Sequence, residues 1–252
     1  MIKRVYQRFQ KYRYLLFELS KRDFKKKYKR TVFGMLWSVL SPLMTLLIMQ
    51  IFFSIFFAQS IPHYTIYLFA GNIVFSYFSE ATNAGMMSLM SNKDIFAKVN
   101  MPKYMFVFSA NSSALINFVI TVFVFFIFVA IDGIPFHWRF IYLIIPIVCL
   151  LGFNIGVGLI LSAVNMFFRD TSYLYGIFTT LLMYASAIFY DVNAFPENMQ
   201  RLFLINPVYV FIKYFRVVVI DGNLPSPIFR FFTILFPVIT ISFGMLIYKK
   251  YQ

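Results

Sequence analysis

The sequence predicts an all-α integral membrane protein with six transmembrane helices, an N-terminal amphipathic interfacial helix, and re-entrant outer helices between spans five and six. Of its 252 residues, 61% are hydrophobic and only 13% are charged, too few to give a soluble globule a polar surface. Twelve of the 23 Lys and Arg residues lie in the first thirty positions, and residues 31–79 contain no Asp, Glu, Lys or Arg. A charged side chain is costly at the bilayer centre, and about 20 apolar residues cross the hydrocarbon core. We therefore expect a cytoplasmic basic segment over residues 1–30 and a transmembrane domain over 31–252.

The basic segment has the periodicity of an amphipathic helix over residues 4–20. Apolar side chains recur there at intervals of three and four, while Arg4, Arg8 and Lys11 share another face. The apolar positions are Val5, Phe9, Tyr12, Leu16 and Leu19. Such a helix serves either as an anchor on anionic lipid or as a mobile gate or docking element, and the periodicity favours the anchor.

The uncharged tracts define six candidate spans. The tract from 31 to 79 must fold back once, and its polar, Pro-containing break is Gln-Ser-Ile-Pro-His at 59–63. The expected spans cover 33–57, 64–87, 104–131, 140–168, 171–190 and 231–248.

The distribution of Lys and Arg sets the expected orientation. With the N-terminus inside, 18 of these residues are cytoplasmic, and Arg139, Arg201, Lys213, Arg216 and Arg230 are the five on the outer side. Because cytoplasmic loops carry an excess of Lys and Arg, this asymmetry favours six spans with both termini cytoplasmic.

The outer region 191–227 contains an apolar tract, 202–212, that is too short to cross the bilayer. Asn206-Pro207 lies in its middle, and Pro207 would interrupt a helix there. Broken backbone at membrane depth is tolerated where protein covers it or a cavity wets it. We expect two short helices that dip into the outer leaflet and meet at Asn206-Pro207.

Several chemistries are not expected from this chain. No Gly-x-x-x-x-Gly-Lys-Ser/Thr phosphate loop occurs, so any ATP must be hydrolysed by another chain. His63 and His137 have no partners at metal-ligand spacing, and no Ser, His and Asp set suggests a catalytic site. The single Cys149 excludes an intrachain disulfide. The basic residues border apolar spans, which argues against nucleic acid as a partner.

Two features inside the spans call for partners. Glu80 is the one acidic residue within a predicted transmembrane span, and we expect it to accept hydrogen bonds from a neighbouring helix rather than to carry protons or substrate. Gly152, Gly156, Gly158 and Ser162 allow close helix approach, either within the bundle or at a dimer face.

The first inner loop, 88–103, mixes charge with apolar side chains. We expect a short helix that presents these side chains to a soluble partner. The candidate coupling residues are Asn92, Asp94, Ile95, Phe96, Lys98, Val99 and Pro102. Arg169-Asp170 forms a second tight inner turn, either a functional pair or simply a marker of the membrane interface.

Several segments in order resemble one family, the membrane subunits of type-2 ABC exporters for bacterial surface polysaccharides such as O-antigen, capsule and teichoic acid. The first match is a membrane-entrance motif with Arg22-Asp23, Gly34, Trp37 and Pro42. The others are Asn92 to Pro102 with its Lys-Val-x-x-Pro ending, the aromatic-Arg-Asp turn at 168–170, and Ile188-Phe189-Tyr190 followed by Asn206-Pro207. Ala187 stands where relatives often have Pro, so a Pro-dependent bend is not expected there.

This resemblance implies a homodimer that binds two copies of a separate ABC ATPase, which would carry the ATP and Mg²⁺ that this chain lacks. It implies that Asn92 to Pro102 is the coupling helix, that the N-terminal helix also meets the ATPase, and that the outer re-entrant helices close the exit. It makes Arg169-Asp170 an interface or helix-end pair.

The expected function is export of a lipid-linked polysaccharide, carried on undecaprenyl diphosphate, across the bacterial cytoplasmic membrane. One alternative is an ABC permease for drugs or lipids. Another, of a different class, is a membrane-embedded enzyme acting on polyprenyl-linked sugars, whose acidic or His groups would come from Asp132, His137, Asp191 and Glu197.

Overall fold

The computed structural model describes residues 2–29, 31–57, 61–98 and 102–251, and within these ranges every regular element is a helix. The α-helices are α1 (Ile2–Tyr28), α2 (Trp37–Phe57), α3 (Tyr64–Ser91), α4 (Lys93–Lys98), α5 (Tyr104–Ile131), α6 (Ile144–Phe167), α7 (Thr171–Ala185), α8 (Glu197–Leu202), α9 (Pro207–Val219) and α10 (Pro227–Tyr251). The 3₁₀ turns are η1 (Gly34–Leu36), η2 (Trp138–Leu143), η3 (Val192–Ala194) and η4 (Phe203–Ile205). The all-α prediction is confirmed.

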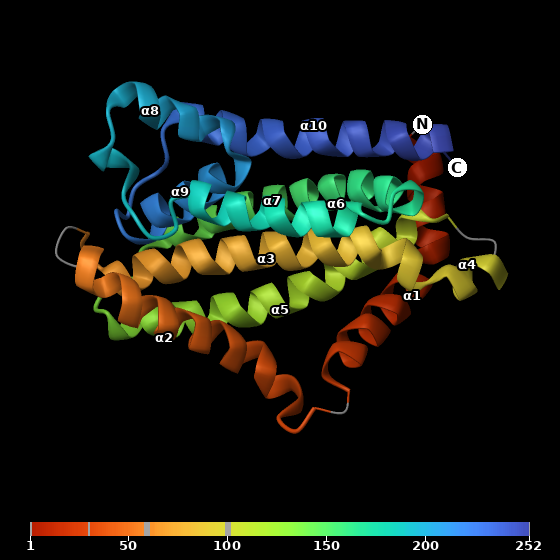
Figure 1. The fold of residues 1–252 in the computed structure, drawn as a ribbon, viewed down its shortest axis with the longest axis horizontal. Helices are drawn as coiled ribbons and strands as arrows, with labels where there is room; N and C mark the ends of the chain where they lie inside the picture. Colours follow the sequence, from red (N-terminus) through yellow and green to blue (C-terminus); the bar gives the residue numbers. More distant parts are fainter. Residues whose placement is uncertain (1, 30, 58–60, 99–101, 252) are drawn as a thin grey trace.

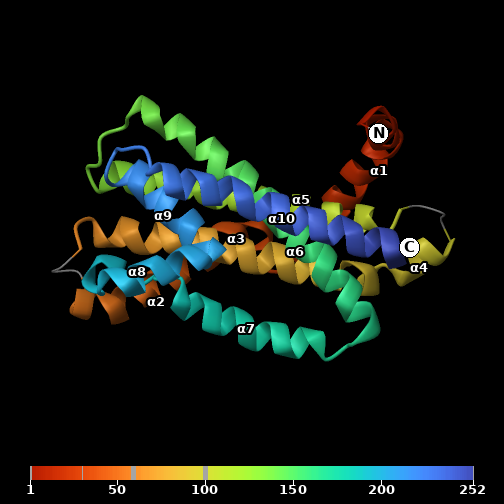
Figure 2. The same ribbon diagram turned by 90° about the horizontal axis from the view of Figure 1, so that it is seen from above.

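The long helices lie side by side in one elongated bundle with two distinct ends. Both termini, α4 and the turn between α6 and α7 lie at one end, whereas α8 and α9 lie at the other (Figures 1 and 2). We call these the terminal end and the α8–α9 end. α1 and α2 lean away from the bundle as a V whose open side faces α3 and α5 (Figure 1).

Four helices of the described chain are long and apolar enough to cross a bilayer. They cover Gly34–Ile55, Tyr104–Ile131, Trp138–Phe167 and Pro227–Lys249, and a fifth would be the pair Glu197–Ile205 and Pro207–Val219 if this bent pair were one span. α3 has the length but carries Asn72, Ser76, Glu80 and Asn83, and α7 has only 15 residues. The chain is a multi-pass membrane protein, and its six-span layout stays a prediction.

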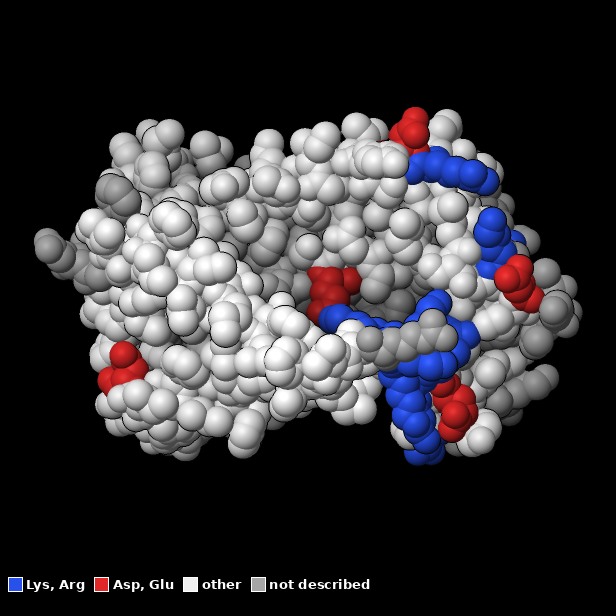
Figure 3. All heavy atoms as spheres, turned by 60° about the horizontal axis from the view of Figure 1, so that its bottom comes forward, with Lys and Arg blue, Asp and Glu red and all other residues white. Residues whose placement is uncertain are grey.

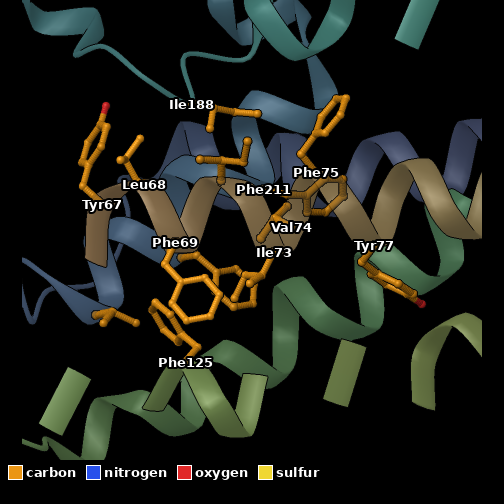
Figure 4. Close-up of a cluster of buried hydrophobic side chains, with 14 of the residues drawn as sticks. Tyr67, Leu68, Phe69, Ile73, Val74, Phe75, Tyr77, Phe125, Ile188 and Phe211 are labelled. Atoms are coloured by element: carbon orange, nitrogen blue, oxygen red, sulfur yellow. The ribbon is translucent and has the colours of Figure 1, made fainter. Parts of the chain in front are cut away.

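α3 is the central helix of the bundle. It packs against α2, α5, α6 and α9, and nearly all of its first four turns are buried. Phe69 of α3 and Phe125 of α5 meet edge to face, with ring centroids 5.5 Å apart (Figure 4). In lipid, helix association depends on close packing and hydrogen bonds rather than on hydrophobic burial. This interlocking of aromatic side chains therefore accounts for much of the cohesion of the bundle.

Glycines bring α6 into close contact with its neighbours inside the bundle. A Cβ atom on Gly156 would lie 2.5 Å from the carbonyl carbon of Thr240 in α10, and Gly158 faces Gly85 of α3. Gly156 and Gly158 are buried. Of the two interpretations of this small-residue run, the structure supports packing within the bundle.

The fifth predicted span ends earlier than expected. α7 stops at Ala185 rather than at Tyr190, and Ala187 adopts a left-handed backbone conformation with φ of 51°. The chain thus bends at 186–190 although no proline stands there. The bend depends on contacts from other helices, described below, which a local sequence pattern does not contain.

Candidate functional site

A hydrogen-bond network at the terminal end joins two segments that are 70 residues apart in the sequence. Arg22 Nη2 donates to Asp23 Oδ1 and to Asn92 Oδ1, at 2.7 Å in each case. Ser109 Oγ of α5 donates to Asp23 Oδ2 at 2.9 Å, and Asn92 Nδ2 donates to the carbonyl of Ser88. The network therefore ties the Arg22-Asp23 pair of α1 to the residue that precedes α4.

The apolar face of α1 packs against protein around this network. Leu19 is buried in a cluster with residues of α3, α5, α6 and α10, and Tyr12, Leu15 and Leu16 pack against the same cluster. The interpretation of residues 4–20 as a lipid anchor is therefore wrong for the face that carries Tyr12, Leu16 and Leu19, because these side chains pack against the bundle. The side chains of Val5 and Phe9 lie outside the described residues.

α4 follows Asn92 directly, and the side chains of its first three residues are described. The carbonyl of Asn92 accepts from the amide of Ile95, and Asp94 is exposed. We expected Ile95 to be presented to a soluble partner, but it is half-buried against the cluster that holds Leu19. The side chains of Phe96 and Lys98, and Val99 entirely, lie outside the described residues. Pro102 is half-buried where α5 begins.

Arg169 and Asp170 form the turn between α6 and α7 at the same end of the bundle. Both are exposed, and the structure gives no ion pair between them in this fully described segment. Their carbonyls accept from the first amides of α7, and the exposed Phe168 precedes them. The pair thus starts a helix with exposed side chains, and the turn lies at the same end of the bundle as α4 (Figure 2).

Glu80 has the hydrogen-bonded partner on a neighbouring helix that the sequence predicted, and also an ion pair. Asn117 Nδ2 of α5 donates to Glu80 Oε1 at 2.7 Å, and Lys27 Nζ of α1 lies 2.8 Å from the same oxygen. Tyr28 donates to Asn117 Oδ1 at 2.8 Å. Burial raises the pKa of the Tyr28 phenol, which keeps this donor protonated. Glu80 is therefore satisfied from two helices.

Two cavities lie on either side of the Lys27–Glu80 pair, and both are lined by it. The inner cavity, of about 490 Å³, is also lined by Arg22, Lys26 and Asn92. The second, of about 420 Å³, extends toward α2, where Trp37 and Pro42 line it. Figure 3 shows acidic surface recessed in a hollow beside a cluster of basic side chains. The pair thus divides one polar cleft that runs between the V of α1 and α2 and the helices α3 and α5.

Gly34 shapes the apex of this V. Its φ of 51° is a left-handed conformation that an L side chain rarely adopts, and it starts η1 before α2 begins at Trp37. Of the membrane-entrance motif, Arg22, Asp23, Trp37 and Pro42 therefore line the cleft, while Gly34 allows the chain to reverse beside it.

At the α8–α9 end, two short helices meet at Asn206, as predicted, with a bend of 108°. Asn206 Oδ1 caps α9 by accepting from the amides of Val208 and Tyr209. Its Nδ2 donates to Ala185 O and Ser186 Oγ, and Pro207 occupies the first turn, where its missing amide proton costs nothing. Whether the two helices dip into the outer leaflet stays a prediction.

Arg216 of α9 is a functional candidate that our sequence analysis missed. We placed it among the outer basic residues, but it is only 3% exposed and lies in the core. Its guanidinium donates to the carbonyls of Tyr67, Ala187 and Ile188 at 2.8–3.2 Å. The signal that could have revealed it is its position in the apolar run 214–220, because a charge within such a run is buried only with partners.

Arg216 and two tyrosines together bind four consecutive carbonyls. Tyr64 and Tyr67 of α3 donate to the carbonyls of Phe189 and Tyr190 at 3.0 and 2.8 Å, while Arg216 binds those of residues 187 and 188. The Arg216 guanidinium carbon also lies 3.3 Å from the centre of the Tyr67 ring. These contacts replace the missing helical hydrogen bonds, which explains why the chain can leave the helix at Ala187 inside a membrane protein.

Comparison with known proteins identifies a family for most of the chain. The family described as "ABC-2 type transporter" matches residues 14–220. The O-antigen export system permease protein RfbA of Myxococcus xanthus is 25% identical over 228 residues, which cover 90% of this chain and 86% of that protein. RfbA of Klebsiella pneumoniae is 27% identical over 216 residues, covering 83% and 82%. The polysialic acid transport protein KpsM of Escherichia coli is 22% identical over 234 residues, covering 90% of each chain.

Proposed function

Because this chain belongs to the ABC-2 type transporter family, we propose that it is the permease subunit of an exporter that moves a polysaccharide across the bacterial inner membrane. The similar proteins named above are polysaccharide export permeases, which favours this substrate class over drugs or simple lipids. In this family the chain is a transport subunit, and a separate subunit hydrolyses the ATP. The family match rejects the alternative of a membrane-embedded enzyme.

The observation that carries this proposal is the polar cleft that lies next to the segments for which we propose a coupling role. α4, the Arg169-Asp170 turn and both termini share one end of the bundle, and the Arg22–Asp23–Asn92 network connects that surface to the cleft. A soluble ATPase that moves α4 would therefore also move α1, which forms one wall of the cleft. The coupling surface is proposed to face the cytoplasm, and the break at Asn206 to form the outer exit.

We further propose that the substrate is a lipid-linked polysaccharide on undecaprenyl diphosphate, and that two permeases and two ATPases form the exporter. The inner cavity supports a diphosphate-linked substrate, since Arg22, Lys26 and Lys27 line it and such cations bind phosphate oxygens. The exposed apolar side chains of α2 and α7 need lipid or a second copy to cover them, which is compatible with a dimer.

Deletion of the gene and its complementation test the proposed export function. The deletion strain should lose its surface polysaccharide and retain the polymer inside, and the wild-type gene should restore export. Asp23→Ala should restore little export, because it removes the acceptor that joins α1 to α5. Asp221→Ala, at an exposed position after α9, keeps this network and serves as the matched control. Unchanged surface polysaccharide in the deletion strain would reject the function. Retained polymer without a lipid anchor would reject only the lipid-linked form.

A further inference from the structure

The cavity next to α2, which we call the neutral chamber, is built differently from the basic inner cavity. Aromatic rings form part of its wall: Trp37 lies on α2, and Tyr77 of α3 stacks on Phe118 of α5 with ring centroids 4.4 Å apart. Its volume of about 420 Å³ lies within the range of small-molecule pockets, roughly 300–1,000 Å³. The chamber therefore has room for a small ligand with a flat apolar face.

The neutral chamber also contains hydrogen-bonding groups that the fold does not use. Asn72 is only 3% exposed, and its Nδ2 has no hydrogen-bond partner among the described residues. A buried amide donor left in this state costs free energy, and a ligand that accepts a hydrogen bond from it would remove this cost. Asn72 Oδ1 already accepts from Ser76, so Nδ2 is the free donor.

The hydroxyls of the chamber offer acceptors to the same ligand. Ser38, Thr45 and Thr121 each donate to a backbone carbonyl of a nearby residue in their own segment, which leaves the lone pairs of their oxygens available. The charged groups that line the chamber are Lys27 and Glu80 at its inner end, and they are paired with each other. The chamber thus presents donors, acceptors and aromatic faces without a free charge.

We infer that the neutral chamber binds a sugar ring of the exported chain. This inference rests on the proposed function and adds the part of the substrate that the site recognises. A pyranose has an apolar face, which packs on aromatic rings, and a rim of hydroxyls that both donate and accept. An acyl chain would leave Asn72 unpaired, and an anion would find Lys27 already engaged by Glu80.

Photocrosslinking in living cells tests this inference without knowledge of the glycan. The two tryptophans of the chain provide a matched pair, since Trp37 lines the chamber and Trp138 is exposed at the start of η2, outside it. Each is replaced in turn by p-benzoylphenylalanine, cells that are exporting polymer are irradiated, and the permease is stained for carbohydrate with periodate. We expect at least fivefold more carbohydrate adduct from position 37 than from position 138.

A second substitution tests whether the free amide donor of Asn72 helps to bind the crosslinked sugar. Asn72→Leu in the position-37 probe should lower the adduct yield at least threefold at unchanged amounts of permease. Thr240→Val on α10, whose hydroxyl bonds within its own helix, should leave the yield unchanged. If the position-37 probe does not insert, Ser41, which lines the chamber and is exposed, carries the probe instead.

The possible outcomes separate this inference from the proposed function. If the deletion strain lacks surface polysaccharide but positions 37 and 138 give equal adducts, or only lipid adducts, the inference fails and the export function stands. The inference also fails if the position-37 probe gives as much carbohydrate adduct with Asn72→Leu as without it. If the deletion strain keeps its polysaccharide, the proposed function itself fails.

Discussion

Replacing Arg216 by Met should destabilise the protein more than any exposed arginine does. The change removes the donors to the carbonyls of Ala187 and Ile188, for which the described structure gives no other partner. A buried carbonyl without a partner costs about 1–3 kcal/mol. Two such groups amount to about 2–6 kcal/mol. Not burying a guanidinium returns about 1–2 kcal/mol of this, which leaves a net loss of about 1–4 kcal/mol.

The assay is thermal unfolding of the purified permease in detergent, followed by intrinsic fluorescence or by the fraction that stays monodisperse. At roughly 2–4 °C per kcal/mol for a chain of this size, Arg216→Met should lower Tm by about 2–16 °C. The Tm of Arg216→Lys should lie between those of the wild type and Arg216→Met, because a lysine ammonium keeps the charge but lacks the planar guanidinium that donates to several carbonyls at once. Arg201→Met, at an exposed site of α8, should shift Tm by less than about 2 °C.

A result that would refute this reasoning is an Arg216→Met protein that melts within about 2 °C of the wild type. It would mean that the segment 186–190 finds other donors, and that the guanidinium does not hold α9 against α3. A fall of equal size in Arg201→Met would refute it as well, because the effect would then reflect any lost arginine rather than the buried carbonyl contacts.

Three further predictions concern packing, coupling and topology. Gly156→Val should push α6 away from α10 and lower Tm by several degrees, because even a Cβ atom at Gly156 would lie 2.5 Å from Thr240. Gly176→Val should leave Tm unchanged, because the space around Gly176 is open, and equal melting of both variants would contradict this packing. Phe96→Ala should weaken binding of the ATPase in a pull-down or uncouple ATP hydrolysis from export, since burial of such a side chain yields about 1.5–3 kcal/mol, while membrane insertion stays normal. Normal binding of the ATPase together with normal export would contradict the coupling role. In a Cys149→Ala background, a Cys at position 206 should react more slowly than a Cys at position 222 with a membrane-impermeant thiol reagent added from outside. Labelling of position 206 from the cytoplasm would show that this segment is a full span and would reject the six-span layout.

The sequence predicted most of the segments that form the candidate site, but it did not predict which of them contact one another. The Arg22-Asp23 motif, the loop that begins at Asn92, Glu80 and the break at Asn206 were all found as local patterns of charge, polarity or proline. Their partners were not found, because a local pattern does not state which distant residue it meets. Lys27 and Glu80 are 53 positions apart, and Arg22 and Asn92 are 70 apart.

Burial was the property that sequence patterns misjudged most. Ile95 and the face of α1 around Leu19 were expected to face a partner or lipid, yet both pack in the same cluster at the terminal end. Arg216 was counted only as a basic residue of the outer side, and its burial in the core was not predicted. In a soluble protein an apolar or charged side chain indicates its own environment, but in a chain where most residues are apolar either lipid or protein can cover a given face.

The sequence by itself determined the class of protein, the helical content and the positions where most helices begin and end. It could do so because the bilayer acts on residues one at a time: charge is expelled, backbone must be hydrogen-bonded internally, and proline interrupts helices. The tertiary structure alone decided that four carbonyls beyond α7 are bound by Arg216 and two tyrosines, and that one ion pair divides a polar cleft. These features depend on the close approach of side chains from separate helices, which is a property of packing geometry and not of any single segment.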